Sequence, residues 1–260
     1  MSTAERVRPA PSRPGREPGR EAGREPGRPT RLLDVAIGVV GEVLVTLGVL
    51  VLAFLAWQLW WTDVIADGEQ AQTVSGLEQR FAASTASRAP AVTAQVGQAF
   101  ATIRIPRFGA DYVRPVIEGT AKAQIDAGVG HSPGTAMPGR VGNFATAGHR
   151  VTYGKPYNLI HTLQPGDAIV VETSAGWSVY RYQRHRIVTP DQTEVLAPVP
   201  DRPGVAPTQA WMTLVACHPP FSARERYVGY ALLERFVPRD EGPPTDALAA
   251  PAGGATNGTG

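Results

Sequence analysis

Cysteine is nearly absent from this chain: Cys217 is the single one among 260 residues, so no disulfide can form within it. Clustered histidines, cysteines and carboxylates at short spacings are also lacking, so we expect no metal site. The segment Gly128–Gly130 is followed by neither the helix nor the lysine of a phosphate-binding loop, and we expect no cofactor. One free thiol therefore has to be explained, either as a small buried apolar side chain or as a reactive group.

Apolar side chains are scarce in residues 1–31, which repeat a Gly-Arg-Glu theme and carry eight arginines against four glutamates. Such a composition buries too little apolar surface to fold, so this segment is predicted to be a disordered basic arm. The interleaved glutamates neutralise half of the positive charge, which argues against a nucleic-acid-binding tail. A simpler interpretation is a topology signal beside the hydrophobic segment that follows.

That hydrophobic segment predicts a membrane anchor. The only ionisable residue in Val35–Trp61 is Glu42, and a helix of this length exceeds the ~30 Å hydrocarbon thickness of a bilayer. Trp57, Trp60 and Trp61 lie at one end and the arginine excess lies at the other, which places the N-terminus in the cytoplasm and the body outside. No small-residue cleavage site follows, so we expect a retained single-pass anchor in the plasma membrane rather than a cleaved signal peptide.

The composition divides the chain into further segments. The anchor, residues 32–61, is followed by a polar, alanine-rich stretch, residues 62–98, which predicts an extracellular and partly helical spacer. In residues 99–238 short apolar runs alternate with turn signals, as is typical of a closed all-β domain. Residues 239–260 lack periodicity and predict a disordered tail. The candidate strands are Phe100–Ile105, Phe144–Ala147, Ala168–Thr173, Trp177–Val188, Trp211–Ala216 and Arg226–Glu234.

Three side chains at predicted strand ends carry the chemistry that a thiol needs. Cys217 ends the run Trp211–Ala216, and a reactive thiolate requires positive charge nearby. Arg226 opens the last strand, so a hairpin would return its guanidinium toward the sulfur, where it can stabilise a thiolate or an oxyanion. His149 follows another apolar run at a strand-to-loop edge and can carry a proton. Each of these residues taken alone also has an ordinary structural explanation.

The order of these motifs resembles the sortase family. Thr213–Cys217 reads Thr-Leu-Val-Ala-Cys and resembles the TLxTC motif that ends the seventh strand of the sortase barrel. Ala147–Arg150 resembles the sortase histidine loop, and Arg226 stands nine residues after the cysteine, where sortases carry their arginine. The resemblance covers roughly Phe100–Val237, with further matches in Ile103–Pro106, Pro133–Gly139, Asn143–Phe144 and Leu163–Asp167.

This resemblance implies a closed eight-stranded β-barrel preceded by one N-terminal transmembrane helix. It implies a cysteine transpeptidase that cleaves a C-terminal LPxTG-type signal of secreted proteins between Thr and Gly, and that transfers the acyl group to an amine of a peptidoglycan precursor. Surface proteins would thereby be anchored to the cell wall. Cys217 would be the nucleophile, His149 the general acid and base, and Arg226 the group that stabilises the oxyanion and substrate.

Two details refine the resemblance. The runs Cys217–Pro219 and Ser222–Arg226 are similar to class E sortases of high-GC Gram-positive bacteria, which tend to accept LAxTG signals. Ala216 stands where the usual motif has Thr, and the missing hydroxyl and methyl groups beside the sulfur bear on peptide preference rather than on activity. Residues 62–99 show no Asp-Pro-aromatic lid, so a housekeeping anchoring role is favoured over pilus assembly.

Some alternatives stay open at this point. His218 adjoins Cys217, but consecutive strand residues point in opposite directions, so His149 is favoured. Arg224 would share a face with Arg226 in an extended strand, and the choice of Arg226 rests on the family spacing. The remaining histidines, which are His131, His161 and His185, are interpreted as ordinary surface or structural residues. The non-enzymatic alternative is a membrane-tethered β-domain that binds cell-wall or surface-protein partners.

Overall fold

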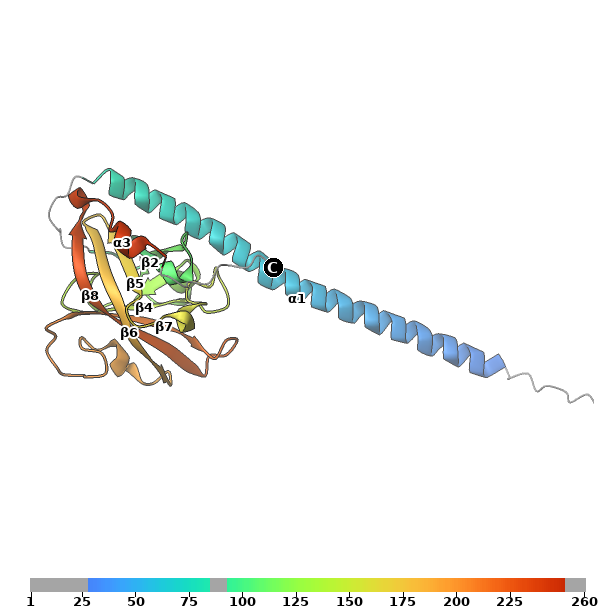
Figure 1. The fold of residues 1–260 in the computed structure, drawn as a ribbon. Helices are drawn as coiled ribbons and strands as arrows, with labels where there is room; N and C mark the ends of the chain where they lie inside the picture. Colours follow the sequence, from blue (N-terminus) through green and yellow to red (C-terminus); the bar gives the residue numbers. More distant parts are fainter. Residues whose placement is uncertain (1–27, 85–92, 251–260) are drawn as a thin grey trace, which may run out of the picture. The chain divides into compact units, whose positions relative to one another are not determined.

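The computed structural model describes residues 28–84 and 93–250 (Figure 1), and the chain divides into two compact units, residues 1–53 and 54–260. The predicted disordered arm therefore lies almost entirely outside the described residues. Helix α1 spans Arg28–Ala82. Its segment Arg31–Trp57 is long and apolar enough to cross a membrane, which confirms the predicted candidate span.

The part of α1 that belongs to the second unit buries one stripe of side chains against the β-domain. These side chains recur every three or four residues, the spacing of one helix face: Ala66, Gln70, Val74, Leu77 and Phe81. Beside the stripe, Asp63 pairs with Lys155 at 2.8 Å and Asp67 pairs with Arg114 at 3.0 Å. The stretch predicted as a partly helical spacer is thus helical as far as Ala82, and its helix is packed.

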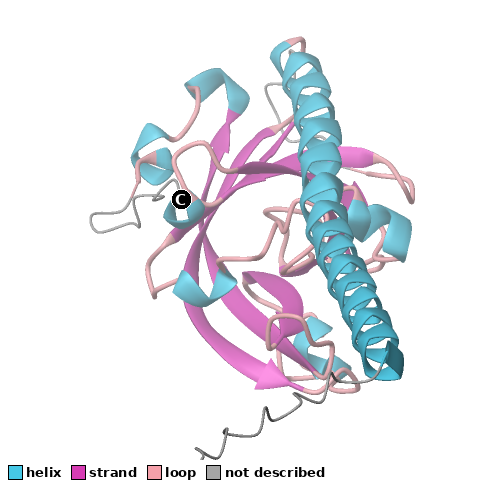
Figure 2. Ribbon diagram, turned by 90° about the vertical axis from the view of Figure 1, so that its right-hand side faces the viewer, coloured by secondary structure: helices cyan, strands magenta, loops and turns pink. Residues whose placement is uncertain are grey.

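The β-domain is a closed barrel (Figure 2), which confirms the predicted fold class, and its strand order is β1-β2-β3-β4-β7-β8-β6-β5. Two neighbouring pairs, β2 with β3 and β4 with β7, are parallel, and the others are antiparallel. The strands are β1 (Ala99–Arg104), β2 (Val113–Glu118), β3 (Val129–His131), β4 (Gly142–Ala147), β5 (Ala168–Thr173), β6 (Gly176–Val188), β7 (Ala210–His218) and β8 (Glu225–Pro238).

Short helices lie in the connections between strands and after β8. They are η1 (Pro106–Phe108), α2 (Lys122–Asp126), η2 (Ile160–Thr162), η3 (Thr193–Leu196), η4 (Arg239–Glu241) and α3 (Thr245–Leu248). Two of them matter for the site: α2 lies between β2 and β3, and η3 lies in the long connection from β6 to β7.

The six predicted strands are all present, within a few residues of their expected ends, whereas β2 and β3 were not predicted. β2 contains Pro115, which lacks the backbone N–H that a ladder uses. The structure tolerates it because Pro115 pairs with Thr102 of β1, and the pairing of β2 with β3 begins only at Val116. β3 has three residues, too few to show a period in the sequence.

The predicted boundary of the C-terminal tail is wrong. Residues 239–250 are ordered, and Ala247 of α3 is buried against Val170, Trp177 and Val179. The guanidinium of Arg239 adds a second attachment, because it lies 4.6 Å from the centre of the Trp177 ring. A few well-placed contacts therefore order a segment whose composition predicts disorder. The last ten residues lie outside the described part of the chain.

Candidate functional site

Cys217 and Arg226 face each other across the β7–β8 hairpin. Their Cα atoms are direct partners in the antiparallel register, so both side chains project from the same face, with Cβ atoms about 4.5–5.5 Å apart. The cysteine is partly exposed. The Nη1 atom of Arg226 donates hydrogen bonds to the carbonyl oxygens of Ala223 and Glu225, each at 2.9 Å. The hairpin that the sequence predicts thus places Arg226 opposite Cys217, with its guanidinium held by loop carbonyl oxygens.

The register of β7 and β8 also shows that the two alternative residues, Arg224 and His218, do not share the face of Cys217 and Arg226. Arg224 is exposed and precedes the first residue of β8, so it has no strand face to share with Arg226. His218 pairs with Glu225, one position along from Cys217, so its side chain projects from the opposite face. Its Nδ1 atom accepts a hydrogen bond from Nη1 of Arg150 at 2.8 Å.

His149 reaches the same edge of the barrel through the parallel pair β4–β7. Ala147 of β4 is the partner of Val215 of β7, and His149 and Cys217 each lie two residues further on, at the carboxyl ends of parallel strands. Gly148 makes this exit possible, because a Cβ atom there would lie 2.9 Å from the ring of Tyr157. The structure therefore brings all three predicted site residues to one edge of the barrel.

The imidazole of His149 has two neighbours that fix its place. Its Nε2 atom lies 2.8 Å from Oδ1 of Asp126 at the end of α2, and both side chains are 21% exposed. Its ring stacks on the ring of Tyr153, with the centroids 5.0 Å apart and an interplanar angle of 30°. Lys122 joins both neighbours, since its Nζ pairs with Asp126 and donates to the Tyr153 hydroxyl at 3.0 Å.

Arg150 places a second guanidinium behind the thiol. It is 5% exposed, and its Nη1 atom donates to the Cys217 carbonyl oxygen at 3.3 Å as well as to His218. Burial lowers the pKa of Arg150, and the nearby Tyr227 and Cys217 groups oppose that shift. Its Nε atom is buried without a hydrogen-bond partner. A buried cation thus ties the histidine loop to the end of the cysteine strand.

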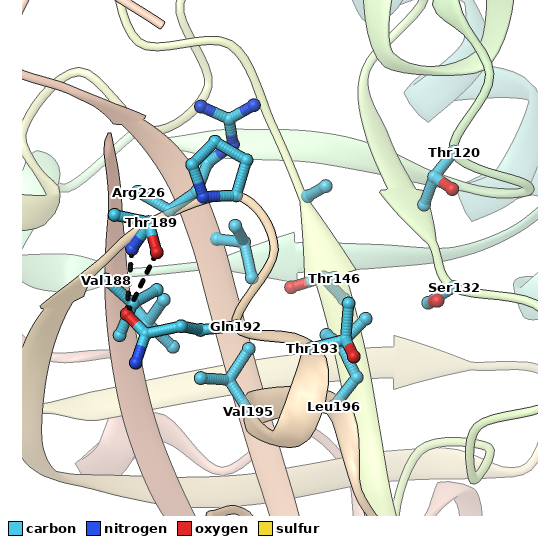
Figure 3. Close-up of a pocket in the computed structure, with 14 residues that line it drawn as sticks. Thr120, Ser132, Thr146, Val188, Thr189, Gln192, Thr193, Val195, Leu196 and Arg226 are labelled. Carbon is cyan, nitrogen blue, oxygen red and sulfur yellow. Dashed lines mark hydrogen bonds between the residues drawn. The ribbon is translucent and has the colours of Figure 1, made fainter. Parts of the chain in front are cut away.

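A pocket of about 160 Å³ extends from Arg226 between the ends of β4, β7 and β8 and the connection from β6 to β7 (Figure 3). Apolar side chains and threonines make up most of its wall. Cys217 and His149 are not among the lining residues, so the pocket lies beside them. The lining residues are Thr120, Ser132, Thr146, Ala147, Val188, Thr189, Pro190, Gln192, Thr193, Val195, Leu196, Val215, Arg226 and Val228.

The wall that η3 contributes to this pocket is anchored by buried polar groups. Nδ2 of Asn143 in β4 donates to the carbonyl oxygens of Val195 and Ala197 at 3.1 and 3.0 Å. Its Oδ1 atom accepts a hydrogen bond from Thr213 of β7 at 2.8 Å. Buried polar groups of this kind are costly to leave unpaired, so Asn143 fixes the position of the wall.

The same connection is anchored a second time at Asp201. Its carboxylate accepts hydrogen bonds from Arg184 at 2.8 Å, Arg186 at 2.5 Å and the Tyr230 hydroxyl at 2.9 Å. Burial raises the pKa of Asp201, but these three donors outweigh it and hold the pKa below its ordinary value. The connection that forms the pocket wall is therefore held at two places, at Val195 and Ala197 and again at Asp201.

His131 and His185 make their contacts with other side chains of the β-domain. His131 is buried in the barrel, where Nδ1 lies 2.6 Å from Glu118 and Nε2 lies 2.9 Å from the Thr135 hydroxyl. His185 stacks on Tyr227 with the ring centroids 4.7 Å apart. Within the described ranges, no group of three or more histidines, cysteines and carboxylates is placed to hold a metal ion.

Comparison with known proteins gives a match to the family model described as the Sortase domain, over residues 103–234. The chain belongs to the sortase family. Sortase SrtE1 of Streptomyces coelicolor is 39% identical over 224 residues, which are 83% of this chain and 62% of that relative. Sortase SrtE2 of the same organism is 29% identical over 232 residues, which are 84% of this chain and 90% of that relative.

Solved structures that resemble this chain are also sortases. The SrtF sortase from Corynebacterium diphtheriae matches with a TM-score of 0.59 and 33% identity, over 62% of this chain and 97% of that one. Sortase E1 from Streptomyces coelicolor, solved with a tripeptide in its active site, matches with a TM-score of 0.54 and 38% identity, over 60% of this chain and 100% of that one. The predicted likeness to class E sortases is confirmed, and sortases in general are cysteine transpeptidases.

Some features of this sortase escaped sequence reasoning. Asp126 had no motif around it, and Arg150 was part of the histidine-loop match without a role. Ala216 is 2% exposed and packs in the barrel core, while Val215 lines the pocket. The substitution beside the sulfur therefore faces the core, and the strand alternation in Thr213–Cys217 was the signal that predicts this.

Proposed function

We propose that this sortase cleaves a C-terminal LAxTG or LPxTG sorting signal between Thr and Gly, and transfers the acyl group to an amine of a peptidoglycan precursor. The secreted protein that carries the signal would thereby become anchored to the cell wall. The observation that carries the proposal is the direct pairing of Cys217 with Arg226 at the barrel edge that the chain reaches at His149, two residues after the end of β4.

The chemistry follows from these groups. The Cys217 thiolate attacks the threonine carbonyl carbon, and the guanidinium of Arg226 stabilises the oxyanion. The C–N bond breaks when His149 gives a proton to the departing glycine amine, which leaves a thioester on the sulfur. The acceptor amine then attacks the thioester, His149 takes its proton, and the C–S bond breaks to release the new amide and the thiolate.

The pocket beside Arg226 supports recognition of an apolar signal. Val188, Leu196 and Val228 offer apolar surface suited to the leading leucine, and Ala147 and Val215 lie nearer the thiol end of β4 and β7. Burying a leucine side chain contributes about 1.5–3 kcal/mol. A bound signal would thus place its threonine carbonyl toward Cys217 and Arg226.

We also propose that the chain is a single-pass protein of the plasma membrane, with its N-terminus in the cytoplasm and its barrel outside. The apolar segment Arg31–Trp57 and the arginines before it support this orientation. Cys217 provides the test, because it is the single cysteine. A membrane-impermeant maleimide should label intact cells that carry the wild-type chain and leave Cys217→Ala unlabelled. Labelling only after lysis contradicts the orientation.

The activity is tested with the full chain in detergent micelles. The protein is incubated with LAxTG and LPxTG peptides and triglycine, and the products are identified by mass spectrometry. We expect the triglycine adduct from the wild type and none from Cys217→Ala, and the yields rank the two signals. Equal amounts of adduct from both proteins, or intact peptides in both, contradict the proposal; the latter result favours a non-catalytic binding domain.

A further inference from the structure

His149 has a carboxylate partner that lies outside the three residues assigned to the reaction. Oδ1 of Asp126 is 2.8 Å from Nε2 of His149, although the two residues are 23 positions apart and lie on different elements. The other oxygen, Oδ2, pairs with Nζ of Lys122 one helical turn earlier. The carboxylate is thus held from one side by a lysine and meets the imidazole on the other.

This contact determines which ring nitrogen carries the proton. A carboxylate oxygen accepts hydrogen bonds and has no proton to give, so Nε2 of His149 must be the donor. In the neutral ring the proton therefore resides on Nε2, and Nδ1 is left free to accept a proton. After Nδ1 has taken a proton, the ring is a cation and the charge of Asp126 stabilises it.

The surroundings hold the ring in this orientation. Tyr153 stacks on His149, and the Tyr153 backbone is itself fixed, since its carbonyl oxygen accepts a hydrogen bond from Nε2 of Gln70 at 3.0 Å. Gln70 is 1% exposed and lies in the packed part of α1. Lys122 links Tyr153 to Asp126. The plane of the imidazole and the direction of its Nε2–H bond are thus both constrained.

We propose that Asp126 is the positioning residue for His149: it holds the imidazole in the Nε2–H tautomer, so that Nδ1 exchanges protons with the thiol and the amines. This inference rests on the proposed role of His149 as general acid and base. Asp126 touches neither substrate nor sulfur in this scheme. It acts through His149, as the third group that orients a catalytic base.

The first test needs no substrate. Long-range ¹H–¹⁵N spectra of the full chain in micelles report the tautomer of each of the five histidines, and a His149→Gln sample assigns the signal. We expect the Nε2–H form for His149 in the wild type, and a mixture of tautomers in Asp126→Ala and Asp126→Asn. An Nδ1–H form in the wild type, or unchanged signals in both variants, overturns the proposal.

The second test is kinetic. We expect kcat for transpeptidation to fall about 10- to 100-fold in Asp126→Ala, below the ~10²–10⁴-fold that a general acid–base group itself contributes, with KM nearly unchanged. Asp126→Glu should recover part of kcat. The matched control is Glu234→Gln, which removes a surface carboxylate paired with Arg181 and Arg235 and should leave kcat unchanged.

The outcomes separate this inference from the proposed function. A wild-type chain that exchanges no signal peptide but shows the Nε2–H tautomer, lost in Asp126→Ala, refutes the transpeptidase proposal and leaves the orienting contact in place. Normal kcat in Asp126→Ala, with melting temperatures equal to wild type, overturns the positioning role. If Asp126→Ala fails to fold, the isosteric Asp126→Asn decides both readouts.

Discussion

Replacing Arg226 should abolish most of the transpeptidation while replacing Arg224 should not. Arg226 lies opposite Cys217 in the register, and its Nη1 atom is held by two loop carbonyl oxygens at 2.9 Å. Loss of one preorganised oxyanion donor costs about 10²–10³ in rate, or roughly 2.7–4 kcal/mol. We therefore expect kcat of Arg226→Met to fall by about 10²–10³, with thermal stability little changed because its two bonds are partly exposed.

Two further variants, Arg226→Lys and Arg224→Met, test whether the effect belongs to the guanidinium of Arg226. Arg226→Lys keeps the charge, but one ammonium nitrogen cannot replace the planar fork that bonds the loop and reaches the substrate, so an intermediate loss of about tenfold is expected. Arg224→Met removes an exposed arginine that precedes β8 and should change kcat less than about twofold. The assay is the initial rate of triglycine exchange on the preferred signal peptide.

A loss in Arg224→Met that matches or exceeds the loss in Arg226→Met would refute the argument from the register. Full activity in Arg226→Met would show that the oxyanion is stabilised by another group; Arg150, whose buried guanidinium donates to the Cys217 carbonyl oxygen, is one candidate.

Further predictions concern the stability of the fold and the reactivity of the thiol. Asp167 and Arg107 form a bidentate pair at 2.6 and 2.8 Å, with side chains 6% and 10% exposed. Asp167→Asn leaves a buried cation and should lower the free energy of unfolding by about 3–5 kcal/mol, seen as a lower melting temperature by circular dichroism. Asp246→Asn, at an exposed position, should leave the melting temperature unchanged. Because the pKa of Asp201 is lowered on folding, Asp201→Asn should destabilise the protein at pH 7, and the difference from wild type should narrow as the pH falls below 3.8; a constant difference contradicts this. Arg150→Met should reduce the rate of Cys217 alkylation by iodoacetamide at pH 7, whereas an unchanged rate would assign Arg150 a purely structural role.

Local patterns in the sequence are enough to predict several features of this protein. A membrane span can be recognised by counting the residues of an apolar run, and the short apolar runs of β5 and β7 mark strands whose residues are mostly buried. The hairpin that brings Arg226 back to Cys217 is also local, because Arg226 stands only nine positions after Cys217 in the chain. These features depend on neighbours along the chain, and that is why they could be predicted.

The tertiary structure decided the contacts between side chains that lie far apart in the chain. The pairing of Asp126 with His149 requires a short helix between β2 and β3 to meet the end of β4, and no period in the sequence encodes that meeting. The packing of α3 and the position of the η3 wall likewise follow from contacts with strands far away in the chain. The sequence by itself thus predicted a candidate membrane span, six of the strands and three site residues that the structure places at one edge of the barrel. Only the closed barrel decided which side chains surround them, because closure brings together segments that have no local interaction.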